Sequence, residues 1–565
     1  MAPIAQPPPS ARVPAGIALA AVAVAALTTW HALRLYLPSL NTPHTSLEGV
    51  AHAPSPVPPT PGLARRLAVI IVDGLSYDHA RSLDALLPLR RLGVLRSLAV
   101  EFPSFTSPAL VSFMTGLDPR DSGTRRNGEL GGVAGLDTVT RAAGDARVPV
   151  TVWAHGYQDF ASLMAPPAGA RISLGKLGIG VELGKRGLAG AAPLEPMSAE
   201  KPAPARALEI IHWGFVDDDG HAHGGRSPEY AASARAAADF VVRYARSLDF
   251  DQDALVVLSD HGHLPGGGHG GAEDVVRHAL FLGVGPLFRR GVELGERPLR
   301  DVASTLSVLG GLRVPSSNLG LPMLDALTLD DEQTSFALAA PFDEAARFLC
   351  QLQPGPRCAA VEPLVARLRK PDPLAWEEAA TLHAALTHDR DADLALRREL
   401  GAHRRLAVAA ALIAAALAAL LLGHRRGGGR LGDGLAFPAA LLPIVYAGVF
   451  MGYGWSLGYR PSFSYLRPIP DLLAHALPGA LLAAAATALF TWMFRPGRLA
   501  GWALLLGTAV PFALLAAWVG WDPTTPPPPV LGTAVFQLAP GMVGAAVAAL
   551  LVTMIARSPA PASKP

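Results

Sequence analysis

The chain has 565 residues, with 48 Lys and Arg against 46 Asp and Glu, so its formal net charge is only +2. Its length exceeds that of one ordinary domain, and its balanced charge gives no general attraction to nucleic acid, which we exclude as a partner. The two cysteines, Cys350 and Cys358, are too few for a cysteine-built zinc finger or a disulfide-dense scaffold.

The first 64 residues predict attachment to a membrane rather than a folded domain. Residues 1–14 are a proline-rich tail, which we expect in the cytoplasm. Residues 15–37 are mostly apolar and predict a transmembrane anchor, with a cleaved signal peptide as the alternative. Residues 38–64 are rich in Pro, Ser, Thr and Ala, which is typical of a linker.

Residues 65–325 alternate strand-like and helix-like segments, and we expect them to form one domain. Five apolar runs are typical of strands that are buried on both faces. They cover residues 67–73, 148–154, 208–217, 254–260 and 278–285. A helix-like stretch, 228–248, lies between two of the runs. This alternation predicts the α/β class, with a mostly parallel sheet flanked by helices.

Residues 326–405 are polar and predict a helical connector that packs beside the α/β domain. Cys350 and Cys358 lie in this segment, on either side of a turn-like stretch. If the segment faces an oxidising compartment, we expect a local disulfide between them. Two independent thiols are the alternative.

The apolar residues 406–556 predict a bundle of five transmembrane helices, and residues 557–565 a second cytoplasmic tail. The predicted spans cover residues 406–423, 435–452, 472–494, 499–521 and 530–556. Each is long enough to cross a hydrocarbon core. Basic loops at 424–430 and 495–498 place both termini in the cytoplasm and residues 38–405 outside it. Four arginines between residues 397 and 405 oppose this orientation.

Metal-binding side chains lie at the ends of the apolar runs or just after them. They are Asp73, Asp217, His221, Asp260, His261 and His269. Ends of parallel strands meet at one edge of an α/β sheet, so we expect these side chains to converge. Taken alone, Asp73 is also typical of a helix N-cap, and Asp217 of a solvated acidic turn. Five histidines in two short loops at strand ends are harder to explain by packing, and they indicate a metal site.

Thr106 lies just before a predicted helix, where backbone N–H groups favour an anionic oxygen. An N-cap is the alternative role, and Ser104 and Ser107 are equally available hydroxyls. Two cations would clamp the attacking and leaving oxygens of an in-line displacement, and one of them would activate the Thr106 hydroxyl as a nucleophile. The mixed Asp and His set suits Zn²⁺ better than Ca²⁺ or Mg²⁺.

The order of these motifs resembles the alkaline phosphatase superfamily. The motifs are VDG at 72–74, FPSFTSP at 102–108, DxxGH at 217–221, SDHG at 259–262 and the glycine-flanked His269. Within the superfamily, the chain is most similar to the nucleotide pyrophosphatase/phosphodiesterases and the GPI ethanolamine-phosphate transferases. The resemblance covers about residues 67–324, and residues 298–324 are similar to the segment that closes the catalytic domain of the transferases.

The resemblance implies two metal sites and a nucleophile. One metal would be held by Asp73, Thr106, Asp260 and His261, and the second by Asp217, His221 and His269. Thr106 would become phosphorylated or phosphodiester-linked. Ala109 stands where the pyrophosphatase branch has Asn, which removes one donor to phosphate and argues against nucleotide substrates. The Cys or Ser motif of the sulfatases is absent around Thr106, which argues against sulfatase activity.

These features together predict an integral membrane metalloenzyme. It would transfer or hydrolyse a phosphoester of a lipid or glycan at the outer face of the membrane, on the periplasmic or lumenal side. The alternative is a non-catalytic membrane protein that keeps the α/β domain as a binding module. A transporter is disfavoured because no charged residue lies in the middle of a predicted span.

Overall fold

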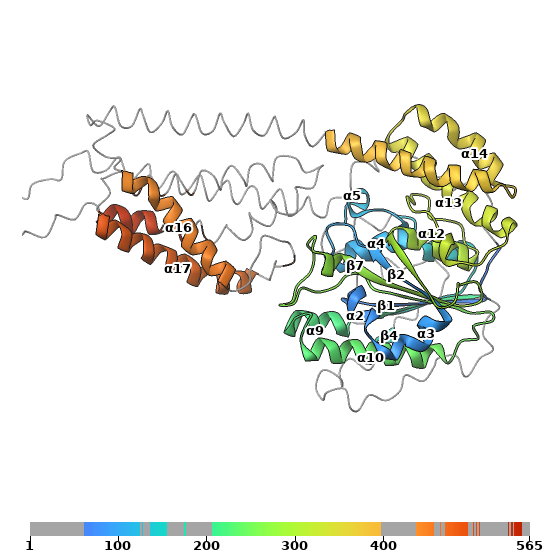
Figure 1. Ribbon diagram of the computed structural model, residues 1–565, viewed down its shortest axis with the longest axis horizontal. Helices are drawn as coiled ribbons and strands as arrows, with labels where there is room; N and C mark the ends of the chain where they lie inside the picture. Colours follow the sequence, from blue (N-terminus) through green and yellow to red (C-terminus); the bar gives the residue numbers. More distant parts are fainter. Residues whose placement is uncertain are drawn as a thin grey trace, which may run out of the picture. The chain divides into compact units, whose positions relative to one another are not determined.

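An eight-stranded sheet organises the α/β region of the computed structural model (Figure 1), with the strand order β4-β3-β5-β1-β6-β7-β2-β8. The strands are β1 (Arg66–Val72), β2 (Gly93–Ala99), β3 (Val150–Ala154), β4 (Gly175–Lys176), β5 (Ala207–Trp213), β6 (Ala254–Leu258), β7 (His278–Val284) and β8 (Val292–Pro298). All neighbours pair in parallel except β7, which is antiparallel to both β6 and β2. The predicted α/β class is confirmed, and the sheet is mixed.

The structure describes most of the α/β region and part of the C-terminal region. The described residues are 61–124, 127, 136–154, 175–176, 206–396, 437–456, 464, 469–494, 501, 504, 508, 541, 544–545 and 547–555. Several predicted features lie outside this set. They are the tail 1–14, the anchor 15–37, nearly all of the linker 38–64, the span 406–423 and the tail 557–565.

Helices cover both faces of the sheet (Figure 1). They are α2 (Tyr77–Arg81), α3 (Leu87–Leu92), α4 (Thr106–Thr115), α5 (Pro119–Ser122), α6 (Val139–Asp145), α9 (Phe215–His223), α10 (Pro228–Ala245), α11 (Asp274–Arg277) and α12 (Asp301–Gly310). Short 3₁₀ helices span Asp84–Leu86 and Leu324–Ala326. One core lies between the sheet and α4, α6 and α12, and a second lies between the sheet and α3 and α10.

Strand β1 shows why a central strand is apolar at its buried positions. Leu67, Val69 and Ile71 face the first core, while Ala68 and Ile70 face the second. A strand that contacts packed helices on both faces has no solvent side, so a polar residue within it would lose water without compensation. The first position that can hold a charge is therefore the residue just after the strand.

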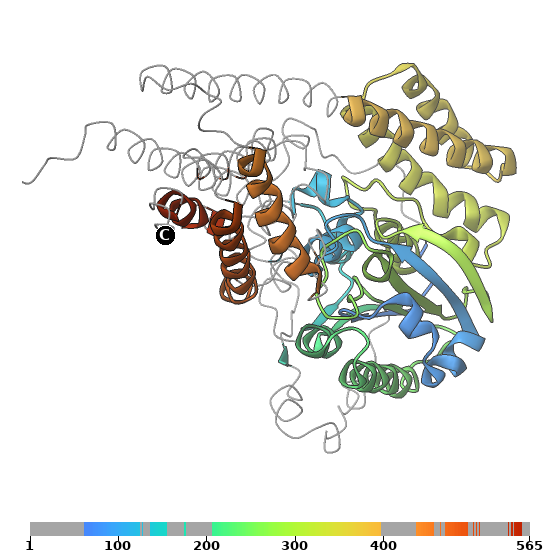
Figure 2. The ribbon, with the colours of Figure 1, turned by 60° about the vertical axis from the view of Figure 1, so that its left-hand side comes forward.

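The connector is helical where the structure describes it. It contains α13 (Asp331–Leu352), a 3₁₀ helix (Pro356–Ala360), α14 (Val361–Leu368) and helical residues 373–396. These segments gather beside the sheet, from yellow-green to gold in Figure 2, and form their own core with Leu117, Leu319 and Leu321 of the α/β region. A disulfide joins Cys350 to Cys358 with an S–S distance of 2.09 Å, which resolves the question that the sequence left open.

The C-terminal region forms a separate compact unit, whereas residues 40–395 form the other. Its described helices are α16 (Phe437–Ser456) and α17 (Ile469–Phe494), which coincide with two of the predicted spans. Among the described residues, one helix is long and apolar enough to cross a membrane, Ala476–Phe494, and Leu441–Gly454 is a shorter apolar helix. The predicted five-span bundle remains a prediction, because most of residues 499–521 and about half of 530–556 lie outside the described set.

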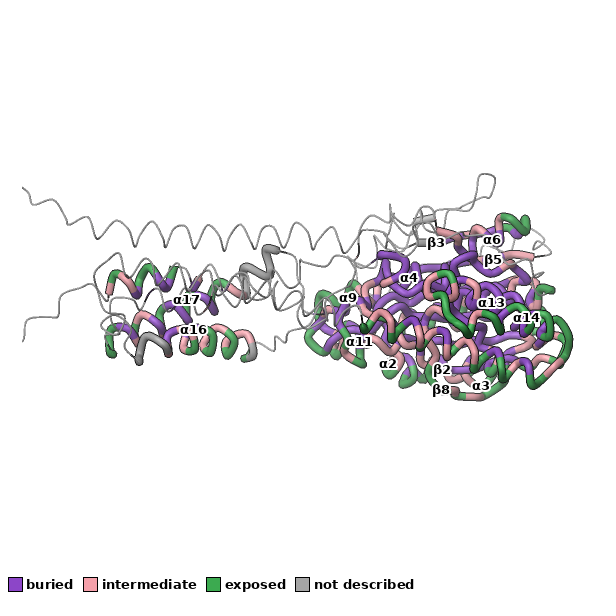
Figure 3. Tube along the Cα trace, turned by 90° about the horizontal axis from the view of Figure 1, so that it is seen from above, coloured by how far each residue is buried: buried purple, intermediate pink, exposed green. Residues whose placement is uncertain are grey.

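Helix α4 is the most deeply placed helix near the sheet edge, and all ten of its residues are buried (Figure 3). It ends at Gly116, which has φ +76°. The amide of Leu319 donates to the Gly116 carbonyl, and the Asn318 side chain lies directly against the glycine Cα. The segment around Asn318 thus fixes the C-terminal end of α4, and through it the position of Thr106 at the other end.

We expect Gly116→Ala to destabilise the α/β region by about 2 kcal/mol or more. The alanine would adopt a left-handed conformation that costs about 1–2 kcal/mol, and its Cβ would overlap the Asn318 amide oxygen. Denaturant unfolding of the full chain in detergent would measure the loss. Gly295→Ala is the matched control, because a Cβ there meets no atom within 4 Å. Equal stability of the two variants would contradict the role given to Gly116.

Candidate active site

The predicted side chains converge at one edge of the sheet. Asp73 follows β1, and Asp260 and His261 follow the neighbouring strand β6 by two and three residues. Asp217 and His221 lie one turn apart on α9, which begins directly after β5, the other neighbour of β1. Thr106 is the first residue of α4 and His269 comes from the glycine-rich loop. The structure brings all seven predicted residues together.

One local prediction was wrong. We expected a strand through residue 217 and an acidic loop after it, but β5 ends at Trp213 and residues 215–223 are helical. The chain leaves the sheet at Gly214, which has helical φ and ψ of −91° and −3°. Helical spacing places residues four apart on one face. Asp217 and His221 therefore point toward the same place, with 3.5 Å between Oδ2 and Nε2.

The first group of ligands surrounds Nε2 of His261, a fully buried side chain. This atom lies 3.4 Å from Asp73 Oδ1, 3.4 Å from Asp260 Oδ2 and 3.1 Å from Thr106 Oγ1. Two ligands of one tetrahedral zinc ion, each about 2.0–2.2 Å from it, would be about 3.3 Å apart. The observed separations match that geometry.

In each of the two buried carboxylates, Asp73 and Asp260, one oxygen has a hydrogen-bond partner and the other has none among the described residues. Asp73 Oδ2 interacts with His212 Nε2 at 3.0 Å, and Asp260 Oδ1 accepts from the backbone amides of Gly74 and His261, both at 3.0 Å. The other oxygens, Asp73 Oδ1 and Asp260 Oδ2, are buried without a hydrogen-bond partner among the described residues. They are the two oxygens that face His261. Buried carboxylate oxygens without donors are costly unless a cation binds them.

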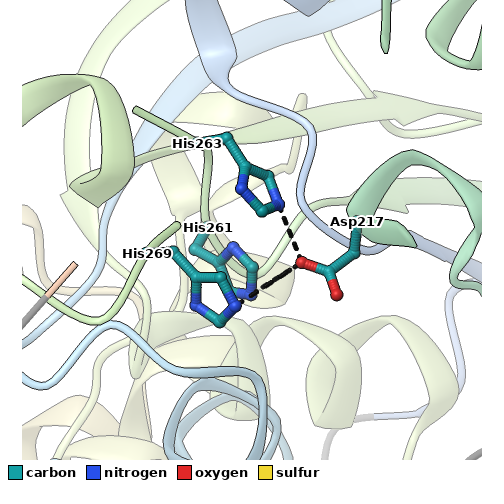
Figure 4. Close-up of side chains that lie close together, drawn as sticks. All are labelled: Asp217, His261, His263 and His269. Carbon is teal, nitrogen blue, oxygen red and sulfur yellow. Dashed lines mark hydrogen bonds and ion pairs between the residues drawn. The ribbon is translucent and has the colours of Figure 1, made fainter. Parts of the chain in front are cut away.

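The second group contains Asp217, His221 and His269. Nε2 of His269 lies 3.0 Å from Nε2 of His221 and 3.5 Å from Asp217 Oδ1. The 3.5 Å separation fits ligands that share one cation, and the two imidazole nitrogens lie slightly closer than the about 3.3 Å expected of such ligands. His221 is about half exposed, at 51%, so this group is open to solvent on one side. Asp217 Oδ1 lies 3.9 Å from His261 Nε2 and links the two groups (Figure 4).

The charges of the carboxylates require compensation. Burial, and then the charges of Asp260 and Asp217, raise the pKa of Asp73 well above its ordinary value. Burial raises the pKa of Asp260 to about 6. A proton shared by the Asp73 and Asp260 carboxylates would relieve the repulsion, and a divalent cation would relieve it more completely.

The imidazoles are already in the form that a metal binds. Burial lowers the pKa of His261 to about 3, and burial together with the charge of His261 lowers the pKa of His269 well below its usual range. Both rings are therefore neutral at physiological pH, with a lone pair available on one nitrogen. The donor set, its spacing and its protonation fit two divalent cations. The structure also groups His263 with Asp217, His261 and His269.

Of the hydroxyls of Ser104, Thr106 and Ser107, that of Thr106 lies beside the predicted metal-binding side chains. Its Oγ1 faces His261, whereas the Ser104 hydroxyl donates to the carbonyl of Gly271 at 2.7 Å. The Ser107 hydroxyl is buried without a hydrogen-bond partner among the described residues. Thr106 also occupies the first turn of α4, where the helix dipole favours an anionic oxygen.

Three residues near these groups were missed or left without a role in the sequence. Asn127 accepts from the Ser107 amide at 2.9 Å, and its Nδ2 lies 3.5 Å from Thr106 Oγ1. An amide donor is therefore present beside Thr106 despite Ala109. His212 contacts Asp73, and His263 contacts Asp217 at 2.8 Å. No local pattern marks Asn127, which lies 21 residues after Thr106, but His263 belongs to the histidine cluster SDHGH.

The fold and the cluster together define a class of α/β protein with a candidate divalent-metal site at the ends of its central strands. Comparison with family models gives no match. Among curated proteins, the chain is 30% identical over 137 residues to GPI ethanolamine phosphate transferase 2 of Yarrowia lipolytica, covering 21% of this chain and 16% of that protein. It is 32% identical over 136 residues to the catalytic subunit of human GPI ethanolamine phosphate transferase 3, covering 23% and 12%. The matched segments thus span less than a fifth of either relative.

Solved structures give low-scoring matches. Murine ectonucleotide pyrophosphatase/phosphodiesterase 5 aligns with a TM-score of 0.35 and 15% identity, over 47% of this chain and all of that chain. Phosphonate monoester hydrolase from Silicibacter pomeroyi aligns with a TM-score of 0.34 and 15% identity, over 46% of this chain and 75% of that chain. The curated relatives point to the alkaline phosphatase superfamily, as the motifs predicted.

Proposed function

We propose that this protein is a membrane-bound, two-metal phosphotransferase or phosphodiesterase that acts through a covalent intermediate on Thr106. The observation that carries the proposal is the shared geometry of four side chains. The Thr106 hydroxyl lies within ligand distance of His261, and the oxygens of Asp73 and Asp260 that face the same imidazole have no donor among the described residues. A threonine used only as a helix cap would not need such neighbours.

The reaction follows from the placement of Thr106. Its Oγ1 loses a proton to solvent and forms a bond to phosphorus, while the bond from phosphorus to the leaving alcohol breaks and that alcohol takes a proton from water. An acceptor alcohol or water then attacks the same phosphorus and releases Thr106. Asn127 Nδ2 is placed to donate to a non-bridging phosphoryl oxygen. Bound divalent cations, of which zinc suits the mixed ligands, would supply the positive charge that makes the hydroxyl acidic.

The proposed substrate is a phosphate ester carried by a lipid or glycan. The curated relatives are named as GPI ethanolamine phosphate transferases, and the chain carries apolar helices such as Ala476–Phe494. An enzyme anchored in a bilayer meets lipid-linked substrates at the surface where they are concentrated. We propose that residues 65–325 form the catalytic domain, 326–405 the connector and 406–556 the membrane bundle.

The proposed function is tested by trapping the intermediate. The full chain in lipid nanodiscs is incubated with zinc and with phospholipids labelled in the head group, quenched in acid and digested. We expect one head group to give a labelled peptide containing Thr106, and no label in Thr106→Ala. A protein that holds two zinc ions but takes no label from any phospholipid or aryl phosphodiester would instead support the non-catalytic binding module.

We place the catalytic domain outside the cytoplasm, and the disulfide supports this placement. Disulfides persist in oxidising compartments and are rare in the cytosol. In intact cells we expect Cys350 and Cys358 to resist a membrane-permeant maleimide until the cells are treated with a reductant. The control is Ser563→Cys in the predicted cytoplasmic tail, which should react with the permeant reagent and not with an impermeant one. Labelling of Cys350 without reduction would argue against this orientation.

A further inference from the structure

His263 is a buried histidine beside the second ligand group that the sequence left without a role. It follows His261 by two residues in the loop after β6, and its side chain is fully buried. Its Nε2 lies 2.8 Å from Asp217 Oδ1 (Figure 4). The same carboxylate belongs to the group with His221 and His269.

The distance separates two possible roles for His263. Two ligands of one tetrahedral zinc ion would lie about 3.3 Å apart, whereas a charge-assisted hydrogen bond spans about 2.7–2.9 Å. The 2.8 Å separation therefore indicates a hydrogen bond. The other ring nitrogen, Nδ1, is buried without a hydrogen-bond partner among the described residues. A proton on Nδ1 would have no acceptor among the described residues. The proton therefore resides on Nε2, and His263 donates to Asp217.

The surrounding residues hold the ring in place. Residue 220, between the two ligands of α9, is glycine, and a Cβ at this position would overlap the His263 ring. The rings of His221 and Tyr230 approach it edge-on, with centroids 4.9 Å and 6.1 Å away. The contact with Gly220 lets α9 pack directly on the imidazole. The ring thus has little freedom to turn away from Asp217.

We infer that His263 is a positioning residue for the second metal position. It donates to Oδ1 of Asp217 and orients the carboxylate so that Oδ2 lies 3.5 Å from His221 Nε2 and Oδ1 lies 3.5 Å from His269 Nε2. The role rests on the proposed two-metal function. Partners of this kind change metal affinity by about 10–100-fold when they are removed.

Zinc affinity tests this role without reference to turnover. The full chain in detergent is stripped of metal and titrated with zinc against a chromogenic chelator, as wild type, His263→Leu, His263→Gln and His263→Asn. We expect His263→Leu to bind one of two zinc ions about 10–100-fold more weakly, with two still bound at saturation. Glutamine can place an amide N–H near the position of Nε2 and should restore most of the affinity. Asparagine is the matched control, because its shorter amide should not.

Each outcome of the zinc titration supports or overturns the positioning role of His263. Unchanged affinity in His263→Leu, or no recovery in His263→Gln, would overturn it, and a fall to one zinc at saturation would make His263 a ligand instead. Thermal melting of the metal-free variants shows whether they fold. If His263→Leu does not fold, His263→Gln decides, with affinity near wild type in favour and a tenfold loss against. A wild-type chain that binds fewer than two zinc ions would overturn the proposed function itself, which is a separate result.

Discussion

Thr106→Ala is expected to reduce turnover of an aryl phosphodiester by at least ~10³-fold while zinc content stays near two ions per chain. The hydroxyl is the proposed nucleophile, so its loss removes the bond-forming atom. Asp73, Asp260 and His261 remain to hold the cation that faces Thr106. The measurement combines steady-state kinetics of the purified full chain with metal analysis of the same sample.

Two variants control for other effects of the substitution. Thr106→Ser keeps a hydroxyl at the same position and should retain measurable turnover. Ser107→Ala removes the next hydroxyl, which has no hydrogen-bond partner among the described residues, and should leave the rate within a few-fold of wild type. Full activity in Thr106→Ala would contradict the role given to Thr106. A loss of activity in Ser107→Ala, with activity retained in Thr106→Ala, would contradict it as well.

Metal removal is expected to abolish activity, and metal binding is expected to weaken as the pH falls below about 6. Protons compete with a cation for the carboxylates, because burial raises the pKa of Asp260 to about 6 and that of Asp73 well above its ordinary value. They do not compete for His261, whose pKa is lowered to about 3. Zinc affinity should therefore fall up to about tenfold per pH unit for each proton taken up by a carboxylate.

Zinc titrations between pH 5 and 8 would measure this dependence, with infrared spectra of the metal-free protein as the check. A carboxylic-acid carbonyl band should be present at pH 5, fade above about 6, and be weaker in Asp260→Asn. Unfolding free energy is a poor reporter here. A raised Asp260 pKa makes the folded state lose stability as pH rises from about 4 to about 6, whereas a lowered His261 pKa makes it gain stability over the same interval. Affinity that does not change between pH 5 and 8 would contradict the prediction.

The sequence predicts the strands that are apolar along nearly their whole length. Runs such as 67–73 and 254–260 are apolar at nearly every position because helices cover both faces of the sheet, so β1 and β6 could be located together with the carboxylates that follow them. The edge strand β8 was missed, because its residues Val292–Pro298 are all half-buried or exposed and include two glutamates. Its pairing with β2 comes from tertiary packing rather than from composition.

The candidate site was predictable where chemistry and local position coincide. Asp260 and His261 combine metal-binding side chains with a strand end, so the sequence alone identifies them. Asn127 has an ordinary local context, and only the fold shows that it lies beside Thr106. The helical placement of Asp217 and His221 was also missed, because acidic residues and glycine are typical of loops, and burial of Val216 and Gly220 against the rest of the domain overrides that preference.

The packing of the connector sets the smallest fragment that is worth expressing without the C-terminal region. Asp121, just beyond α4, is buried and pairs with Arg390, while Arg120 contacts Asp391 at 2.8 Å. A chain truncated at residue 325 would strand the Asp121 carboxylate without its arginine and uncover Leu117, Leu319 and Leu321. A version without the C-terminal region should therefore extend past Asp391, to about residue 395.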